Sequence, residues 1–89
     1  MIRQRITFAG RVQGVGFRAT ARRIAASHEV TGWVRNESDG TVLLEVQGLP
    51  FATETFLNEL RITMGRHIRA ENSIPVPAVN TESDFMIKH

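Results

Sequence analysis

The 89-residue sequence contains no cysteine, no tyrosine, one tryptophan and no long apolar run. The lack of cysteine excludes disulfide bonds and thiolate chemistry, and it leaves the cellular compartment undecided. No stretch approaches the roughly 18 apolar residues of a membrane span, so we expect no membrane association. The first residues, Met-Ile-Arg-Gln-Arg, have no apolar run after their charges. We therefore expect no signal peptide, and the cytoplasm is the default location.

Lysine is nearly absent too, because ten of the eleven basic side chains are arginines, and the net charge is only +2. Six arginines lie in the first quarter of the chain: Arg3, Arg5, Arg11, Arg18, Arg22 and Arg23. That end of the chain should attract anions in general. Because aromatic side chains for base stacking are scarce, we expect no nucleic-acid partner.

The length fits one domain over residues 1–89, and the 42% hydrophobic and 22% charged fractions are typical of a soluble globular protein. Alternating apolar residues predict strands over residues 2–9, 30–36, 41–47, 67–74 and 85–88. Helical spacing predicts helices over residues 17–28 and from about Pro50 to Gly65. The order β-α-β-β-α-β, with an extra terminal strand, indicates an α+β fold. We predict a two-layer ferredoxin-like sandwich with two helices on one face of an antiparallel sheet.

The most informative stretch is Gly10-Arg11-Val12-Gln13-Gly14-Val15-Gly16-Phe17-Arg18, which joins the first strand to the first helix. Free amides and the positive end of a helix dipole at such a junction suit an anion. Arg18 is a cation in the first helical turn, where the dipole disfavours it unless an anion lies between them. Its planar guanidinium can bind two phosphate oxygens at once. The alternative is that the glycines serve only a tight turn.

In a β-α-β unit the first two strands run in the same direction, so the glycine-rich loop and Asn36 should lie at one end of the sheet. A neutral carboxamide can hold a water molecule without repelling a bound anion. The alternative is that Asn36 serves only the following turn, in which Glu37 and Asp39 are expected to be turn residues. Asp39-Gly40 between two apolar alternations indicates a hairpin.

Other chemistries find little support. Residues 14–19 match a loose dinucleotide fingerprint, but a hairpin after a single helix lacks the parallel sheet that this motif needs. His28, His67 and His89 have no partners at metal-ligand spacing, so we expect no metal site. No Ser-His-Asp or Cys-His arrangement is visible.

The stretch GRVQGVGFR resembles the first signature of the acylphosphatase family. Gly32-Trp33-Val34-Arg35-Asn36, followed by Asp39-Gly40, resembles the second, and Phe85-Met86-Ile87 is similar to the closing strand of the family. The resemblance implies hydrolysis of the carboxyl-phosphate bond of a small acyl phosphate to a carboxylate and inorganic phosphate, without metal or cofactor.

By the same resemblance, Arg18 and Asn36 would be catalytic. Arg18 would bind the phosphate together with the loop, and Asn36 would orient the attacking water. The residues of the substrate-binding loop would be Gln13, Gly14, Val15, Gly16, Phe17 and Arg18.

Two departures from the family pattern lie away from these residues. His28-Glu29-Val30 stands where a Gly-Leu pair is common, and residues 64–74 lack the usual Gly-Pro. Two other functions stay open: a phosphate-binding module with little turnover, as at the N-terminus of hydrogenase-maturation carbamoyltransferases, and an RNA-binding sandwich. We expect a monomer.

Overall fold

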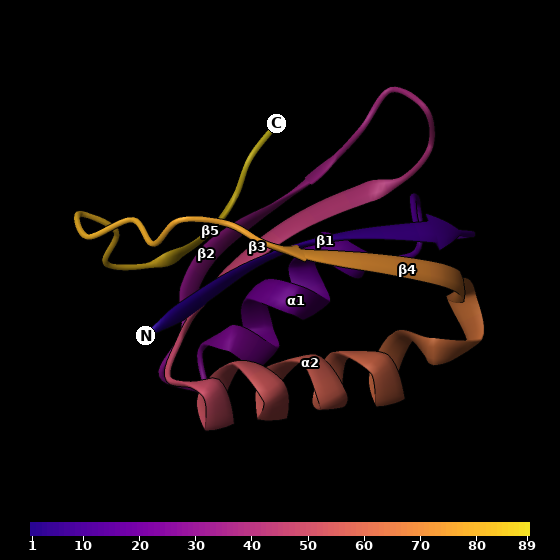
Figure 1. Ribbon diagram of the computed structural model, residues 1–89. Helices are drawn as coiled ribbons and strands as arrows, with labels where there is room; N and C mark the ends of the chain where they lie inside the picture. The colour runs from indigo at the N-terminus through magenta and orange to yellow at the C-terminus, as the bar shows by residue number, and fades with distance from the viewer.

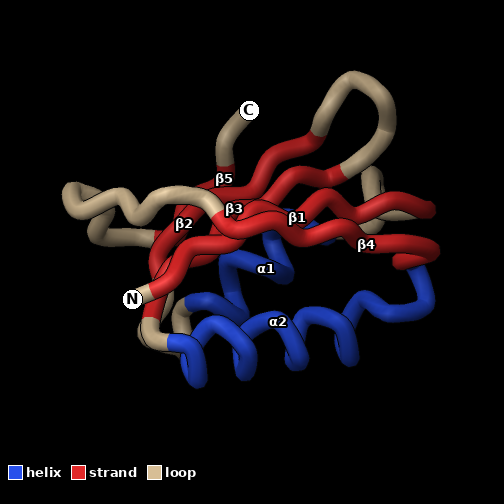
Figure 2. The backbone as a smooth tube through the Cα atoms, viewed as in Figure 1, coloured by secondary structure: helices blue, strands red, loops and turns tan.

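The computed structural model describes residues 1–89 as a five-stranded sheet with two helices on one face (Figures 1 and 2). The elements are, in order, β1 (Ile2–Gly10), α1 (Phe17–Ala25), β2 (Thr31–Asn36), β3 (Val42–Gly48), α2 (Pro50–Met64), a 3-10 turn (Gly65–His67), β4 (Ile68–Pro75) and β5 (Phe85–Ile87). The predicted order of elements is confirmed. Neither helix is both long enough and apolar enough to cross a bilayer.

The sheet has the strand order β4-β1-β3-β2-β5. The first four strands pair antiparallel, as predicted, and β1 and β2 run in the same direction because both are antiparallel to β3. The expectation of a wholly antiparallel sheet is wrong at one edge, where β5 pairs parallel with β2 and Gly32 faces Phe85. The physical reason is the connection: residues 76–84 cross from one edge of the sheet to the other, so no hairpin sets the direction of β5.

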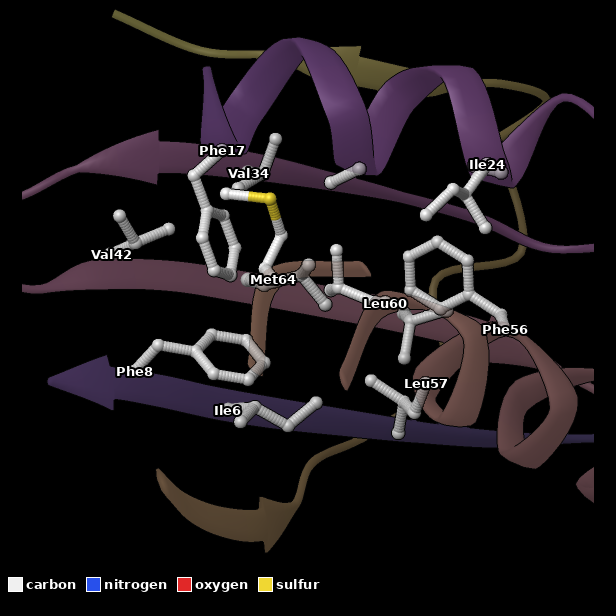
Figure 3. Close-up of a cluster of buried hydrophobic side chains, with 14 of the residues drawn as sticks. Ile6, Phe8, Phe17, Ile24, Val34, Val42, Phe56, Leu57, Leu60 and Met64 are labelled. Atoms are coloured by element: carbon white, nitrogen blue, oxygen red, sulfur yellow. The ribbon is translucent and has the colours of Figure 1, made fainter. Parts of the chain in front are cut away.

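The core fills the space between the helices and the sheet (Figure 3). Alternate residues of the strands and the apolar stripes of both helices meet there, as their spacing predicts. The largest fully buried side chains include Phe8, Phe17, Phe56, Ile6, Ile24, Leu44 and Leu60. Helix α1 ends at Ala25, three residues earlier than predicted, and His28 lies in the following turn with its Nε2 2.9 Å from Glu59 Oε1 of α2.

The face of the sheet away from the helices carries a buried polar cluster that the alternation pattern would place in solvent. Arg3 is only 3% exposed and Glu45 6%. Arg3 Nε donates to Glu45 Oε1 at 2.6 Å, and Arg3 Nη1 donates to Glu82 Oε1 at 2.7 Å. Glu82 belongs to residues 76–84, which we call the strap. The strap lies over Arg3 and shields its ion pair with Glu45 from water.

Backbone contacts also fasten the strap. Gln47 Nε2 donates to the carbonyl of Val79 at 3.0 Å, and the Val79 amide donates back to Gln47 Oε1 at 2.7 Å. The Val76 amide donates to the carbonyl of Arg3 at 3.1 Å. These contacts hold the strap in place as it crosses the sheet to β5 at the far edge. The end of β5 lies at the site described below.

The pKa values of both carboxylates in this cluster, Glu45 and Glu82, lie below their ordinary values. Burial by itself raises the pKa of Glu82, but hydrogen bonds from Arg3 and Thr31 outweigh it and leave the pKa below its ordinary value. Burial also raises the pKa of Glu45, but the hydrogen bonds from Arg3 and Arg5 lower it by more, so that its pKa too is lowered. A carboxylate with a depressed folded pKa stabilises the fold above its unfolded pKa, and this stabilisation is lost as the pH falls through the folded value.

Glu82→Gln should therefore lower the free energy of unfolding at pH 7 by about 2 kcal/mol, less than a fully buried pair would cost because Glu82 keeps some exposure. The corresponding fall in Tm is roughly 10 °C. The difference from the unmodified protein should shrink below about pH 4, where the unfolded carboxylate is protonated. Thermal unfolding from pH 3 to 8 measures both, with Glu54→Gln, an exposed carboxylate outside every ion pair, as the control. A deficit that is constant across this range would contradict the ionic role of Glu82.

Candidate active site

Residues 11–16 connect β1 to α1, and apolar side chains of this connection and of the first residue of α1 anchor it in the core. Val12 and Phe17 are each 1% exposed. The ring of Phe17 lies 5.0 Å from that of Phe8, and the two rings lie side by side in Figure 3. Val15 packs against the same cluster. With these side chains turned inward, the glycines at the intervening positions are exposed to solvent.

Gly14 and Gly16 adopt positive φ angles of 75° and 77°. A Cβ at either position would meet nothing within 4 Å, so glycine is needed for the backbone conformation and not for lack of space. The loop amides of residues 12–16 donate no hydrogen bond to any group of the protein. The first amides of a helix also lack intrahelical partners. The start of α1 is therefore bordered by several free N–H donors.

Gln13 ties this loop to the β2–β3 hairpin. Its Nε2 donates to the carbonyl oxygens of Glu37 at 2.8 Å and Thr41 at 2.9 Å. The side chain of Gln13 is therefore used within the protein, as that of Val15 is, and these two residues can offer a ligand only their backbone amides. The contact fixes the glycine-rich loop relative to Asn36, which ends β2 one residue before Glu37.

Arg18 and Asn36 line one open pocket of about 330 Å³, together with Gly14, Gly16 and Phe17. The sequence predicted this juxtaposition from the parallel direction of β1 and β2, and the structure confirms it. The remaining lining residues are Val12, Ala19, Arg22, Ile87 and His89. Four of the six predicted loop residues thus face the pocket.

The pocket is positively charged and contains no acidic side chain. Arg18 pairs with no carboxylate, and its Nη1 lies 3.5 Å from His89 Nδ1. The nearby carboxylates are engaged in the hairpin, as expected of turn residues. Glu37 accepts a hydrogen bond from Arg35 Nε at 2.9 Å, and Asp39 accepts from the Thr41 hydroxyl at 2.6 Å, which holds the pKa of Asp39 below its usual value. Such a pocket favours an anion.

The sequence did not single out Arg22, Ile87 or His89 as site residues. Arg22 carries a usable signal, because a residue four positions after Arg18 shares its face of the helix. Ile87 and His89 carry none, since only the crossing of the strap brings β5 and the C-terminal residues beside α1. No group of three His, Asp or Glu side chains lies close enough to hold a metal ion.

The acylphosphatase family model matches residues 4–87, which span both the loop and Asn36. The chain belongs to the acylphosphatase family. Among curated acylphosphatases, the Geobacillus kaustophilus protein is 38% identical over 90 residues, covering 100% of this chain and 96% of that protein. The Oceanobacillus iheyensis protein is 46% identical over 56 residues, covering 63% of this chain and 62% of that protein.

Solved structures agree with the acylphosphatase fold. The crystal structure of acylphosphatase from Bacillus subtilis superimposes with a TM-score of 0.87 at 26% identity, covering 100% of both chains. The structure of HypF from T. kodakarensis gives a TM-score of 0.86 at 28% identity, covering 100% of this chain but 12% of that one. The same fold therefore occurs both as a chain of this length and as a small part of a much longer protein.

Proposed function

We propose that the pocket between the glycine-rich loop and Asn36 hydrolyses the carboxyl-phosphate bond of acyl phosphates, with Arg18 and Asn36 as the catalytic residues. The observation that carries this proposal is the grouping, in one pocket without an acidic side chain, of a guanidinium that pairs with no carboxylate, unpartnered loop amides and a carboxamide. Family membership supplies the reaction class.

In the proposed reaction, the loop amides and the guanidinium of Arg18 bind the phosphoryl oxygens. The amides are fixed donors, so they stabilise the charge of the transition state without reorganising. Asn36 holds a water molecule in line with the phosphorus, and this positioning is the main catalytic contribution of its carboxamide.

The water oxygen forms a bond to phosphorus as the bond between phosphorus and the acyl oxygen breaks. The carboxylate leaves with the electron pair of that bond, and the proton of the water passes to a phosphate oxygen. A carboxylate is a good leaving group, so the reaction needs no strong general acid. The pocket accordingly contains no carboxylic acid side chain, and its one imidazole, that of His89, lies beside Arg18.

The first test is hydrolysis of benzoyl phosphate by the purified protein, with and without EDTA. We expect turnover that the chelator leaves unchanged, because the protein groups alone bind the phosphoryl oxygens and place the water. Activity that EDTA abolishes and a divalent metal restores would contradict the metal-independent mechanism. A folded protein that binds inorganic phosphate but shows no turnover would favour a binding module instead.

The second candidate, a phosphate-binding module, is favoured by the similarity to a small part of HypF. An RNA-binding sandwich finds little support, because the chain has one tryptophan and no tyrosine from which to build a base-stacking platform. The one tryptophan, Trp33, is only 9% exposed, and the cations of Arg35 and Lys88 lie 5.0 Å and 4.6 Å from the centre of its ring. A monomeric state and a cytoplasmic location stay predictions of the sequence.

A further inference from the structure

A second hollow, of about 660 Å³, lies along the seam between α1 and β5. It shares three lining residues with the pocket of Arg18 and Asn36, namely Ala19, Arg22 and Ile87. The two hollows therefore adjoin. We call the larger one the α1–β5 groove.

The groove leads away from the proposed phosphate site. Helix α1 begins beside that site and ends near Phe85, where β5 starts. From Arg18 to Ala25 the helix rises about 10 Å, which sets the length available to a bound group. Much of the lining is apolar, including Val30 and Phe85. A substrate whose phosphate is held at the loop could extend its acyl portion along this path.

The charges of the groove are unevenly distributed. Arg22 and Arg23 both line it, and neither forms an ion pair. At the far end, His28 is bound to Glu59, and Asp84 contributes a carboxylate whose Oδ1 accepts the Phe85 amide at 3.1 Å. An anionic group is therefore favoured near Arg22 and disfavoured near Asp84.

The position of Arg22 relative to the proposed phosphate site follows from its spacing to Arg18. It follows Arg18 by four residues on the same face of the helix, a rise of about 6 Å. Because Arg22 lines both hollows, it lies where the proposed phosphate pocket passes into the groove. A second anion only a few bonds from the phosphoryl group would meet it there.

We propose that the α1–β5 groove binds the acyl portion of the substrate and that Arg22 selects acyl groups carrying a second anionic group close to the carboxyl phosphate. The substrate class is the monophosphates of short dicarboxylic acids. This inference rests on the proposed function, and it assigns the specificity of the same site to a residue outside the signature loop.

The test compares succinyl phosphate with 4-methylpentanoyl phosphate, in which an isopropyl group replaces the distal carboxylate at nearly equal size. We expect kcat/KM to favour succinyl phosphate. Arg22→Gln should lower the ratio of the two kcat/KM values about tenfold, the size of one partly exposed charge-assisted contact. Arg22→Lys should keep part of the preference, and added salt should weaken it.

Arg66→Gln is the matched control, because it removes the same charge from an exposed, unpaired arginine outside the groove. It should leave the ratio unchanged. The inference is overturned if the unmodified protein shows no preference, or if Arg22→Gln lowers both kcat/KM values equally. Hydrolysis of neither substrate would instead overturn the proposed function, so the two failures are distinguishable.

Discussion

Arg18→Lys should lower kcat/KM for acyl phosphates by about a hundredfold or more, although the positive charge is kept. The guanidinium of Arg18 borders the pocket together with the free amides of the glycine-rich loop. Its planar fork can contact two phosphoryl oxygens at once, whereas an ammonium acts as a point charge with different reach. Loss of one preorganised donor to a developing oxyanion typically costs 10²- to 10³-fold.

Steady-state kinetics with benzoyl phosphate, together with competitive inhibition by inorganic phosphate, measure this effect. Both turnover and phosphate binding should weaken, because in the proposed reaction Arg18 contacts the phosphoryl group, which is present in substrate and product alike. Arg66→Lys makes the same exchange at an exposed position outside the pocket and should have no effect. Near-normal turnover in Arg18→Lys, with an unchanged Tm, would exclude the assigned role.

Asn36→Ala should lower kcat by about a hundredfold while inorganic phosphate binds almost as before. The carboxamide ends β2 at the edge of the pocket, and its proposed partner is the attacking water. Removing a group that positions the nucleophile affects the transition state far more than the bound phosphate. The measurement is the comparison of kcat with the inhibition constant of phosphate.

Asn36→Asp sharpens this test, because it keeps the size of the side chain and adds a negative charge. We expect it to weaken phosphate binding, which Asn36→Ala should not do, since like charges repel at short range. If Asn36→Ala reduced phosphate binding and turnover in parallel, the residue would be structural.

Gln13 offers a comparison, because its hydrogen bonds to the carbonyls of Glu37 and Thr41 hold the loop against the hairpin. Gln13→Ala should therefore impair both quantities together.

That Arg18 and Asn36 lie at the same pocket could be predicted, because their proximity depends only on how the strands are connected. A right-handed β-α-β unit returns the chain to a strand of the same direction, so the loop after β1 and the end of β2 meet at one end of the sheet. The backbone conformation at the glycines of the loop could also be predicted, because it depends on local preferences. Positive φ angles at Gly14 and Gly16 are a local property of the backbone, and the sequence records them directly.

The strap and its polar cluster could not be predicted in this way. Arg3 and Glu45 alternate with apolar residues in β1 and β3, a pattern that places them on the solvent face of a half-buried strand. They are buried because Glu82, about forty residues further along the chain than Glu45, crosses over them. Periodicity within one strand contains no information about a segment that covers the sheet from elsewhere.

The sequence by itself therefore determined the order of the elements, the helical stripes, the conformation of the glycine-rich loop and the shared location of Arg18 and Asn36. Each follows from local backbone preferences or from the direction of neighbouring strands. The tertiary structure alone decided the parallel pairing of β5, the burial of Arg3 and the α1–β5 groove with Arg22 at its entrance. These features depend on the strap's path across the whole sheet, and such long-range contacts leave no periodic trace in the segments they join.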